Sequence, residues 1–312
     1  MTLIVRDFRV ADAEAVAEAR RAAWPYGVST AEGVAWEVAH APAGRRHRLL
    51  VAEAGGTVVG TAATGMCTAG GAAGHAFAEV RVHPAHRRRG VGTALLHHAE
   101  EHLAGLGTTA VHIRTLDERP CVTFAERRGY RRAAGYRFWR LDPAAAAPAA
   151  PRVPPGVELR TAADLAGDPR GWHTAETEVA RGRPGGVDGG AHEGCGGYAE
   201  YEEWLTAEWG RPDRSAELSS VALVDGAVAA YSAVYRDGGR RVSVRTGVLP
   251  GERGRELAEL TTAHALHRAA AAGCAEVFVG HDADDTAMLD AARSLGLRPA
   301  AAGWRYVREL TV

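Results

Sequence analysis

Lysine is absent from this chain of 312 residues, and all 37 basic residues are arginine. Together with the abundance of alanine and glycine, this is typical of a GC-rich bacterial genome and says little about mechanism. The 38 acidic residues leave a formal net charge of −1, which argues against a strongly basic nucleic-acid binder. We therefore expect no nucleic-acid partner.

Long apolar runs are also missing. No stretch approaches the ~20 apolar residues that a membrane span needs. The first seven residues lack the basic segment and apolar core of a signal peptide. We expect a cytoplasmic protein without a membrane partner. Hydrophobic residues at 46% and charged residues at 24% are ordinary for a folded protein, which excludes wholesale disorder.

Cysteine is scarce. The four cysteines are Cys67, Cys121, Cys195 and Cys274. None forms a C-x-x-C pair, so neither a zinc cluster nor a thioredoxin-type site is expected. Their scatter indicates reduced thiols in a cytoplasm. His98 and His102 have a spacing that can bind zinc on a helix, but no third ligand is evident, and we predict no metal.

A proline-rich segment divides the chain. Residues 143–156 contain repeated prolines, which remove backbone donors and favour extended conformations. We interpret this segment as a Pro/Ala linker between an N-terminal domain over residues 1–142 and a C-terminal domain over residues 157–312. A long surface loop within one domain is the alternative. Residues 1–142 carry a net charge of +5 and residues 143–312 one of −6.

The two halves resemble each other. Residues 51–60 and 221–230 both indicate two apolar strands joined by a glycine-containing turn. This pair and three later landmarks are separated by 166 to 170 residues, which indicates a duplication. Near the start of each half the offset is only 151, so the second copy has about 19 additional residues. The glycine-rich stretch 181–197 is the candidate insert, a surface loop by default or a substrate lid.

Apolar periodicity predicts the elements of the first copy. Helices are expected near 11–22, 30–40, 90–105 and 120–128. Strands are expected near 3–8, 48–54, 57–66, 76–82, 109–114, 130–133 and 135–141. This order predicts an α/β (mixed α+β) unit whose front half is mostly antiparallel.

The most informative segment joins a predicted strand to a predicted helix. The strand ends at Val82, and a basic turn with Arg87, Gly90 and Gly92 opens the helix. Glycine lets the backbone approach a ligand closely, and the free amides of a helix start bind anions. Three consecutive arginines add positive charge, and Thr93 adds a hydroxyl. These features suit a diphosphate, and a solvated basic helix start without a ligand is the alternative.

These residues resemble a known family. Val-x-Pro, then Arg-x-x-Gly-x-Gly and an amphipathic helix, is similar to the acetyl-CoA motif of the GNAT superfamily of N-acetyltransferases. Residues 124–130 resemble the family's later Phe-Tyr-x-x-x-Gly-Phe segment. In the second half, residues 246–258 resemble the CoA loop and residues 282–299 the later motif. The chain is thus similar to a tandem GNAT protein, which implies two domains, each a mostly antiparallel mixed sheet with splayed central strands flanked by helices.

The resemblance implies a cofactor site in the first half. Acetyl-CoA, or another acyl-CoA, would lie between the splayed strands and pass its acyl group directly to an amine. The residues that the motif assigns to it are Val80, Arg81, Val82, Arg87, Arg88, Arg89, Gly90, Val91, Gly92 and Thr93. Glu79 matches the family's fourth-strand glutamate and is the candidate general base. A carboxylate paired with Arg81 is the alternative.

The second half departs from the motif. Its candidate cofactor residues are Thr246, Gly247, Val248, Arg253, Gly254, Arg255, Leu257 and Ala258. Glu256 replaces the first motif glycine, where a carboxylate repels a diphosphate. The family often uses a tyrosine to protonate the leaving thiolate, but Ala125 and Ala292 stand in that position. We expect tighter CoA binding in the first domain, and the resemblance leaves open which domain is catalytic.

Aromatic residues near the predicted acceptor region are candidate substrate contacts, namely Trp24, Tyr26, Tyr198, Tyr201 and Trp204. A helix with a buried aromatic face is the alternative. The negative charge of the second half favours a cationic amine. We expect an acyl-CoA-dependent N-acyltransferase that acts on a small-molecule amine as a monomer, with a homodimer as the alternative. A non-catalytic CoA-binding protein and a protein lysine acetyltransferase are the competing interpretations.

Overall fold

The computed structural model describes residues 2–68, 73–145, 148–181, 200–238, 241–249, 251 and 256–310. The candidate insert lies outside these residues except for Arg181, and so does Tyr198. The Pro/Ala segment is described except for residues 146 and 147.

The first half follows the predicted order of elements closely. Its helices are α1 (Ala13–Ala23), α2 (Ala31–Ala39), α3 (Val91–Ala104) and α4 (Arg119–Glu126). Its strands are β1 (Leu3–Asp7), β2 (Arg48–Ala54), β3 (Thr57–Met66), β4 (His75–Val82), β5 (Ala110–Leu116) and β6 (Arg131–Leu141). Thr30 caps α2, since its hydroxyl accepts a 2.9 Å hydrogen bond from the Gly33 amide.

The second half repeats this order. Its helices are α5 (Arg170–Arg181), α6 (Tyr201–Trp204), α7 (Leu257–Ala271) and α8 (Thr286–Ser294), and a π-helical turn, η5, spans Leu205–Trp209. Its strands are β7 (Val157–Thr161), β8 (Ser220–Val224), β9 (Ala227–Arg236), β10 (Arg241–Val248), β11 (Glu276–Asp282) and β12 (Arg298–Glu309). The predicted duplication is therefore visible as a repeated succession of elements.

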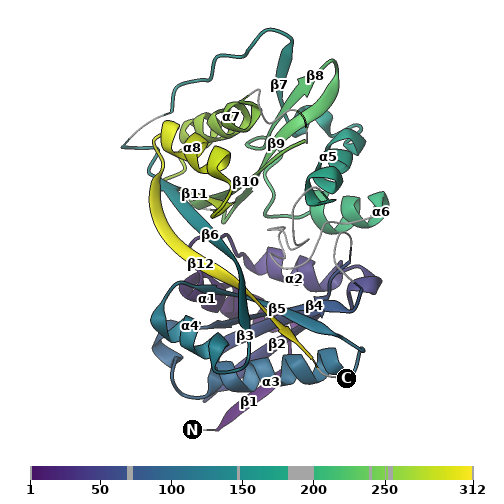
Figure 1. Cartoon of the computed structure of the whole chain (residues 1–312), viewed down its shortest axis with the longest axis vertical. Helices are drawn as coiled ribbons and strands as arrows, with labels where there is room; N and C mark the ends of the chain where they lie inside the picture. The colour runs from purple at the N-terminus through teal and green to yellow at the C-terminus, as the bar shows by residue number, and fades with distance from the viewer. Residues whose placement is uncertain are drawn as a thin grey trace.

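The described strands form one continuous sheet in the order β1-β2-β3-β4-β5-β12-β6-β11-β10-β9-β8-β7. The β4–β5 and β10–β11 pairs are parallel, and the other described pairs are antiparallel. This arrangement confirms the predicted mixed fold. The order also shows that the two halves exchange their last strands, because β12 pairs with β5 and β6 pairs with β11. Figure 1 shows β12, in yellow, running from the second half into the first.

The exchange corrects one prediction. Residues 130–133 and 135–141 do not form two strands, because β6 is a single strand over Arg131–Leu141. Gly135 lies within this strand and allows close packing, because a Cβ there would lie 3.3 Å from the Trp304 ring on β12. The antiparallel neighbour of β6 on this side is β12, from the second half. The boundaries at residues 142 and 157 remain a prediction, and the sheet is continuous across them.

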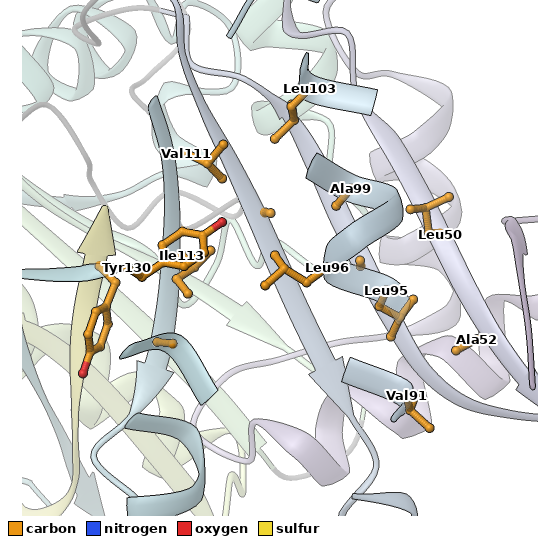
Figure 2. Close-up of a cluster of buried hydrophobic side chains, with 14 of the residues drawn as sticks. Leu50, Ala52, Val91, Leu95, Leu96, Ala99, Leu103, Val111, Ile113 and Tyr130 are labelled. Atoms are coloured by element: carbon orange, nitrogen blue, oxygen red, sulfur yellow. The ribbon is translucent and has the colours of Figure 1, made fainter. Parts of the chain in front are cut away.

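Each exchanged strand buries side chains in the core of the other half. Tyr306 on β12 is fully buried with Leu96 of α3 and Ile113 of β5 in the first-half core. Trp139 and Leu141 on β6 lie in the second-half core. Figure 2 shows how one face of α3 supplies Val91, Leu95, Leu96, Ala99 and Leu103 to the first-half core. Burial of the apolar surface of the exchanged strands stabilises the association of the two halves, at roughly 25 cal/mol per Å².

One cysteine differs from the expectation. Cys67 is disulfide-bonded, so the expectation of reduced thiols is wrong at this residue, whereas Cys121 and Cys274 are free.

A search of the described residues finds no helix that is both long and apolar enough to span a membrane.

We expect Tyr306→Ala to lower the free energy of unfolding by about 3 kcal/mol, because it leaves a cavity in the first-half core. Tyr306 is one of few residues that the second half contributes to this core. Equilibrium urea unfolding measures this change. Arg298→Ala, an exposed position on the same strand, should change the stability by less than about 0.5 kcal/mol. A loss below about 1 kcal/mol in Tyr306→Ala would show that β12 is not needed by the first half.

Candidate active site

A cavity of about 720 Å³ opens where β4 and β5 part. The two strands pair in parallel over only three residues of each, from His75↔Ala110 to Phe77↔His112. Residues of both strands beyond this point line the cavity, Val80 on one side and Ile113 on the other. The separation of two parallel strands therefore creates an elongated space at the centre of the first half.

Most of the predicted cofactor residues line this cavity. They are Val80, Arg81, Val82, Arg87, Arg88, Gly90, Gly92 and Thr93. The two exceptions are Arg89, which is exposed, and Val91, which is buried in the first-half core. The sequence pattern therefore locates the loop but does not show which way each side chain points.

Gly90 sets the geometry of the loop. It precedes α3 with φ of 83°, a left-handed conformation that glycine adopts without strain, and no side chain caps the helix. The first amides of α3 are therefore available to a ligand at the positive end of the helix dipole. Arg87, Arg88, Arg127 and Arg128 line the same cavity and make it suitable for an anion.

Neighbouring contacts fix some of these arginines. The Arg87 guanidinium lies 3.3 Å from the Glu118 carboxylate. The Arg128 guanidinium donates a 2.5 Å hydrogen bond to the Thr93 hydroxyl and lies 3.9 Å from the centre of the Phe124 ring. The loop is thus tied to residues just before and just after α4.

In the second half, two of the described candidate residues pack against the chain's own side chains. The Tyr231 ring lies against Gly247, where an added Cβ would come within 2.5 Å of it. Thr246 is buried and shares hydrogen bonds with the Ser232 and Thr262 hydroxyls at 2.8 and 2.9 Å. Glu256 occupies the left-handed position before α7, with φ of 58°. Among the described residues, the second copy therefore keeps the left-handed position before its helix, where a glutamate replaces the glycine.

The remaining second-half candidates that the structure describes lie in or against the apolar core. Val248 and Leu257 are buried in an apolar cluster against which Ala258 packs. Arg253, Gly254 and Arg255 lie outside the described residues.

A second cavity, of about 180 Å³, lies between the two halves. From the first half it is lined by residues of α1, α2, β4, β5 and β6, including Glu37, Glu79 and Tyr136. From the second half it is lined by residues of β10 and β11 and by the segment that follows η5, including Asp213 and Arg245. Trp24, Arg81 and Arg114 line both cavities. These three side chains are therefore a wall that the two spaces share.

Glu79 faces the cavity between the halves. Its carboxylate lies 3.3 Å from the Arg81 guanidinium, which in turn lies 4.0 Å from the centre of the Trp24 ring. The ion pair that was the alternative for Glu79 is thus present, and the carboxylate still borders the cavity. At the corresponding position of the second half stands Arg245, paired with Glu176 at 3.1 Å and Glu208 at 3.3 Å. Of these two equivalent positions, only that in the first half holds a carboxylate.

A buried group of charges supports the second-half wall. Burial disfavours ionisation of Glu208, but Arg245, Arg211 and Arg214 outweigh it and hold the pKa of this carboxyl below its usual value. Tyr235 donates a hydrogen bond to Glu208, and burial raises the pKa of its phenol well above the ordinary value. The phenol therefore stays protonated at neutral pH and acts as a fixed donor.

The aromatic substrate candidates fall into two groups. Trp24 lines both cavities, and Tyr26 stacks on Phe138 at 5.0 Å between ring centres beside the cavity wall. Trp204 is fully buried in a second-half core cluster, where its indole donates a 2.6 Å hydrogen bond to Glu176, and Tyr201 packs against the same cluster. For these two, the interpretation as a buried aromatic face agrees better with their positions.

Sequence reasoning missed Arg114 and Tyr136. Arg114 stands in the apolar run Ala-Val-His-Ile-Arg-Thr-Leu of β5, where a lone charge is itself a signal. Tyr136 was assigned to the end of a domain, whereas the strand exchange brings it to the interface, where its hydroxyl donates a 2.7 Å hydrogen bond to the Thr115 carbonyl.

The comparisons with known proteins agree with this geometry. Residues 13–130 match the acetyltransferase (GNAT) family. The chain is 30% identical over 231 residues to a mycothiol acetyltransferase of Nocardia farcinica, over 72% of each chain. It is 29% identical over 237 residues to one of Saccharopolyspora erythraea, over 70% of this chain and 71% of the relative.

Two solved structures share the fold. One is a GCN5-related N-acetyltransferase from Sphaerobacter thermophilus, with 21% identity, a TM-score of 0.69 and coverage of 98% of this chain and 95% of the other. The second is a tandem GNAT protein from the clavulanic acid biosynthesis pathway, with 21% identity, a TM-score of 0.71 and coverage of 99% and 98%.

The chain belongs to the GNAT acetyltransferase family. It is a tandem GNAT N-acetyltransferase, an enzyme that transfers an acyl group to an amine. The predicted family, fold and enzyme class are thereby confirmed.

We expect Gly90→Glu to weaken CoA binding at least about 100-fold. The carboxylate would repel the diphosphate, and the side chain is disfavoured at a φ of 83°. Isothermal titration calorimetry with CoA measures the affinity. Gly107→Glu is the matched control: φ is 73°, the surroundings are open, and the residue lines neither cavity. Equal affinities of Gly90→Glu and the unmodified protein would refute the assignment of the loop.

Proposed function

We propose that this enzyme transfers the acyl group of an acyl-CoA, with acetyl-CoA as the default donor, to the amine of a small molecule. The observation that carries the proposal is that two neighbouring cavities share Trp24, Arg81 and Arg114 as lining residues. The larger cavity is lined by a basic helix start and by the last residues of β4, and the smaller one has the Glu79 carboxylate at its border. A donor in one space and an acceptor in the other would meet beside these shared residues.

The residues of the first half suit the donor. Its diphosphate would lie against residues 87–93, where the amides that begin α3 and the surrounding arginines favour negative charge. Its pantetheine arm would follow Val80 and Val82 along β4. When bound, the donor supplies an activated acyl group as a thioester.

Glu79 is our candidate for the base. Alkylamines have a pKa of ~10 and are mostly protonated at neutral pH, so the nucleophile needs a group that accepts a proton. The Glu79 carboxylate borders the acceptor cavity beside Arg81, one of the residues that line both cavities. We propose that it takes the proton of the amine directly or through one water molecule.

The second half would serve acceptor recognition. It contributes Asp213, Ser243, Arg245, Asp282 and Asp285 to the wall of the smaller cavity. The printed name of the relatives makes mycothiol-related amines the first acceptors to test. Because the wall opposite the cofactor cleft comes from the same chain, we propose that the enzyme acts as a monomer.

We expect Glu79→Gln to reduce kcat at pH 7 by about 100-fold and to reduce it much less at pH 10, where the amine is already neutral. The measurement is the pH profile of CoA release with an accepted amine. Glu158→Gln, at an exposed position on β7, should leave the profile unchanged. A loss of the same size at both pH values would remove Glu79 as the base.

A further inference from the structure

A buried hydrogen-bond donor on the wall of the smaller cavity has no partner within the protein. Trp24 is 8% exposed, and its indole N–H has no hydrogen-bond partner among the residues that the structure describes. A buried N–H without a partner is unfavourable and uncommon in folded proteins. Trp139 and Trp304 also bury such an N–H, but of the three only Trp24 lines either of the two cavities described above.

Packing around the indole fixes the direction of this N–H. Trp24 directly follows α1, and its backbone N–H donates a 2.8 Å hydrogen bond to the Arg20 carbonyl. The Arg81 guanidinium lies 4.0 Å from the centre of the indole ring. The Tyr136 and Phe138 rings have their centres 6.0 and 5.6 Å from it. These contacts hold the indole in one orientation.

The N–H edge of the indole borders Gly27, which lines the smaller cavity and not the larger one. An added Cβ at Gly27 would lie 3.5 Å from Cδ1 and 3.9 Å from Nε1 of Trp24. Among the described residues outside 26–28, it would meet no other atom within 4 Å. The side of the indole that faces the smaller cavity therefore has room for one more non-hydrogen atom.

The same segment carries a second polar group of this kind. The Ser29 hydroxyl is buried, belongs to a residue that lines the smaller cavity, and has no hydrogen-bond partner in the described part of the chain. The Ser29 carbonyl accepts a 2.8 Å hydrogen bond from Arg21, which holds the segment against α1. An indole N–H can only donate, whereas a hydroxyl can donate or accept. A ligand that satisfies Trp24 must therefore present an atom that accepts a hydrogen bond.

We propose that Trp24 is a specificity-determining residue whose indole N–H donates a hydrogen bond to an oxygen of the acceptor. The enzyme then prefers amines that carry a hydroxyl or a carboxylate near the amino group, and Ser29 offers a second hydrogen bond. A simple alkylamine of the same size leaves the indole N–H unsatisfied and binds less tightly. This inference rests on the proposed function, which assigns the smaller cavity to the acceptor.

Nuclear magnetic resonance of the indole N–H groups tests the proposal without turnover. The chain has seven tryptophans, and the signal that is lost in Trp24→Phe is that of Trp24. With CoA at saturation, ethanolamine or glycine should move the Trp24 proton signal downfield, because a hydrogen bond to oxygen deshields the proton. Ethylamine, which lacks the oxygen, should leave the signal in place. Whichever of the first two probes moves the signal distinguishes a hydroxyl from a carboxylate.

Gly27→Ala tests the geometry with the indole in place. Its methyl group would occupy the space beside Nε1 at ordinary contact distances, so the fold should be kept while the ligand oxygen is excluded. We expect this variant to lose the shift. Gly167→Ala is the matched control, since its Cβ would meet nothing within 4 Å and Gly167 lines neither cavity.

Steady-state kinetics give a second readout. For an oxygen-bearing amine that the enzyme accepts, Trp24→Phe should raise KM about tenfold with little change in kcat, because one hydrogen bond is lost. For the matched alkylamine, KM should stay as in the unmodified protein. Trp304→Phe removes a buried indole N–H that lines neither cavity and should change neither KM value.

Three results would overturn the proposal. If neither ethanolamine nor glycine moves the Trp24 signal, or if ethylamine moves it equally, the indole N–H does not recognise an oxygen. If Gly27→Ala keeps the shift, the N–H is not approached from the smaller cavity. If calorimetry shows that the protein does not bind CoA at all, the proposed function fails first, and the role of Trp24 in acceptor choice fails with it.

Discussion

The exchange of β6 and β12 is the constraint on which the rest of the structure depends. Each half carries five strands of its own and completes its sheet with a strand that the other half supplies. The two halves are consequently joined by backbone hydrogen bonds and by shared cores, with Tyr306 in one and Trp139 in the other. A linker alone would leave the orientation of the halves open, whereas a continuous sheet fixes it. The cavity between them can therefore be a precise site.

Duplication has left two copies with different capacities. The first keeps glycine at position 90, an open cleft between β4 and β5, and a carboxylate at position 79. The second has Glu256, a Tyr231 ring that lies against Gly247, and Arg245 in a buried group of charges. It contributes one wall of the cavity between the two halves.

Much of this could be predicted from the sequence. Local patterns located the helices and most strands, because apolar periodicity and glycine turns are local signals. The loop around Gly90 was predicted because phosphate binding requires specific residues at fixed spacing, and most of the predicted residues line one cavity. The exchange could not be predicted, since β6 and β12 have the same pattern whichever β5-type strand they join. For the same reason the sequence did not show that Tyr136 and Arg305 meet Arg114 at the site. The disulfide at Cys67 was missed because scatter along a chain does not report distance in space.

Counting bound CoA by native mass spectrometry, with the intact chain and an excess of acetyl-CoA, tests the central claim most directly. The account assigns the donor to the first half alone and the acceptor wall to the second. It predicts one CoA per chain at saturation. Two would show that the second half also binds CoA despite Glu256 and Tyr231, and would contradict the division of labour between the halves. None would contradict the assignment of the first cavity to the donor.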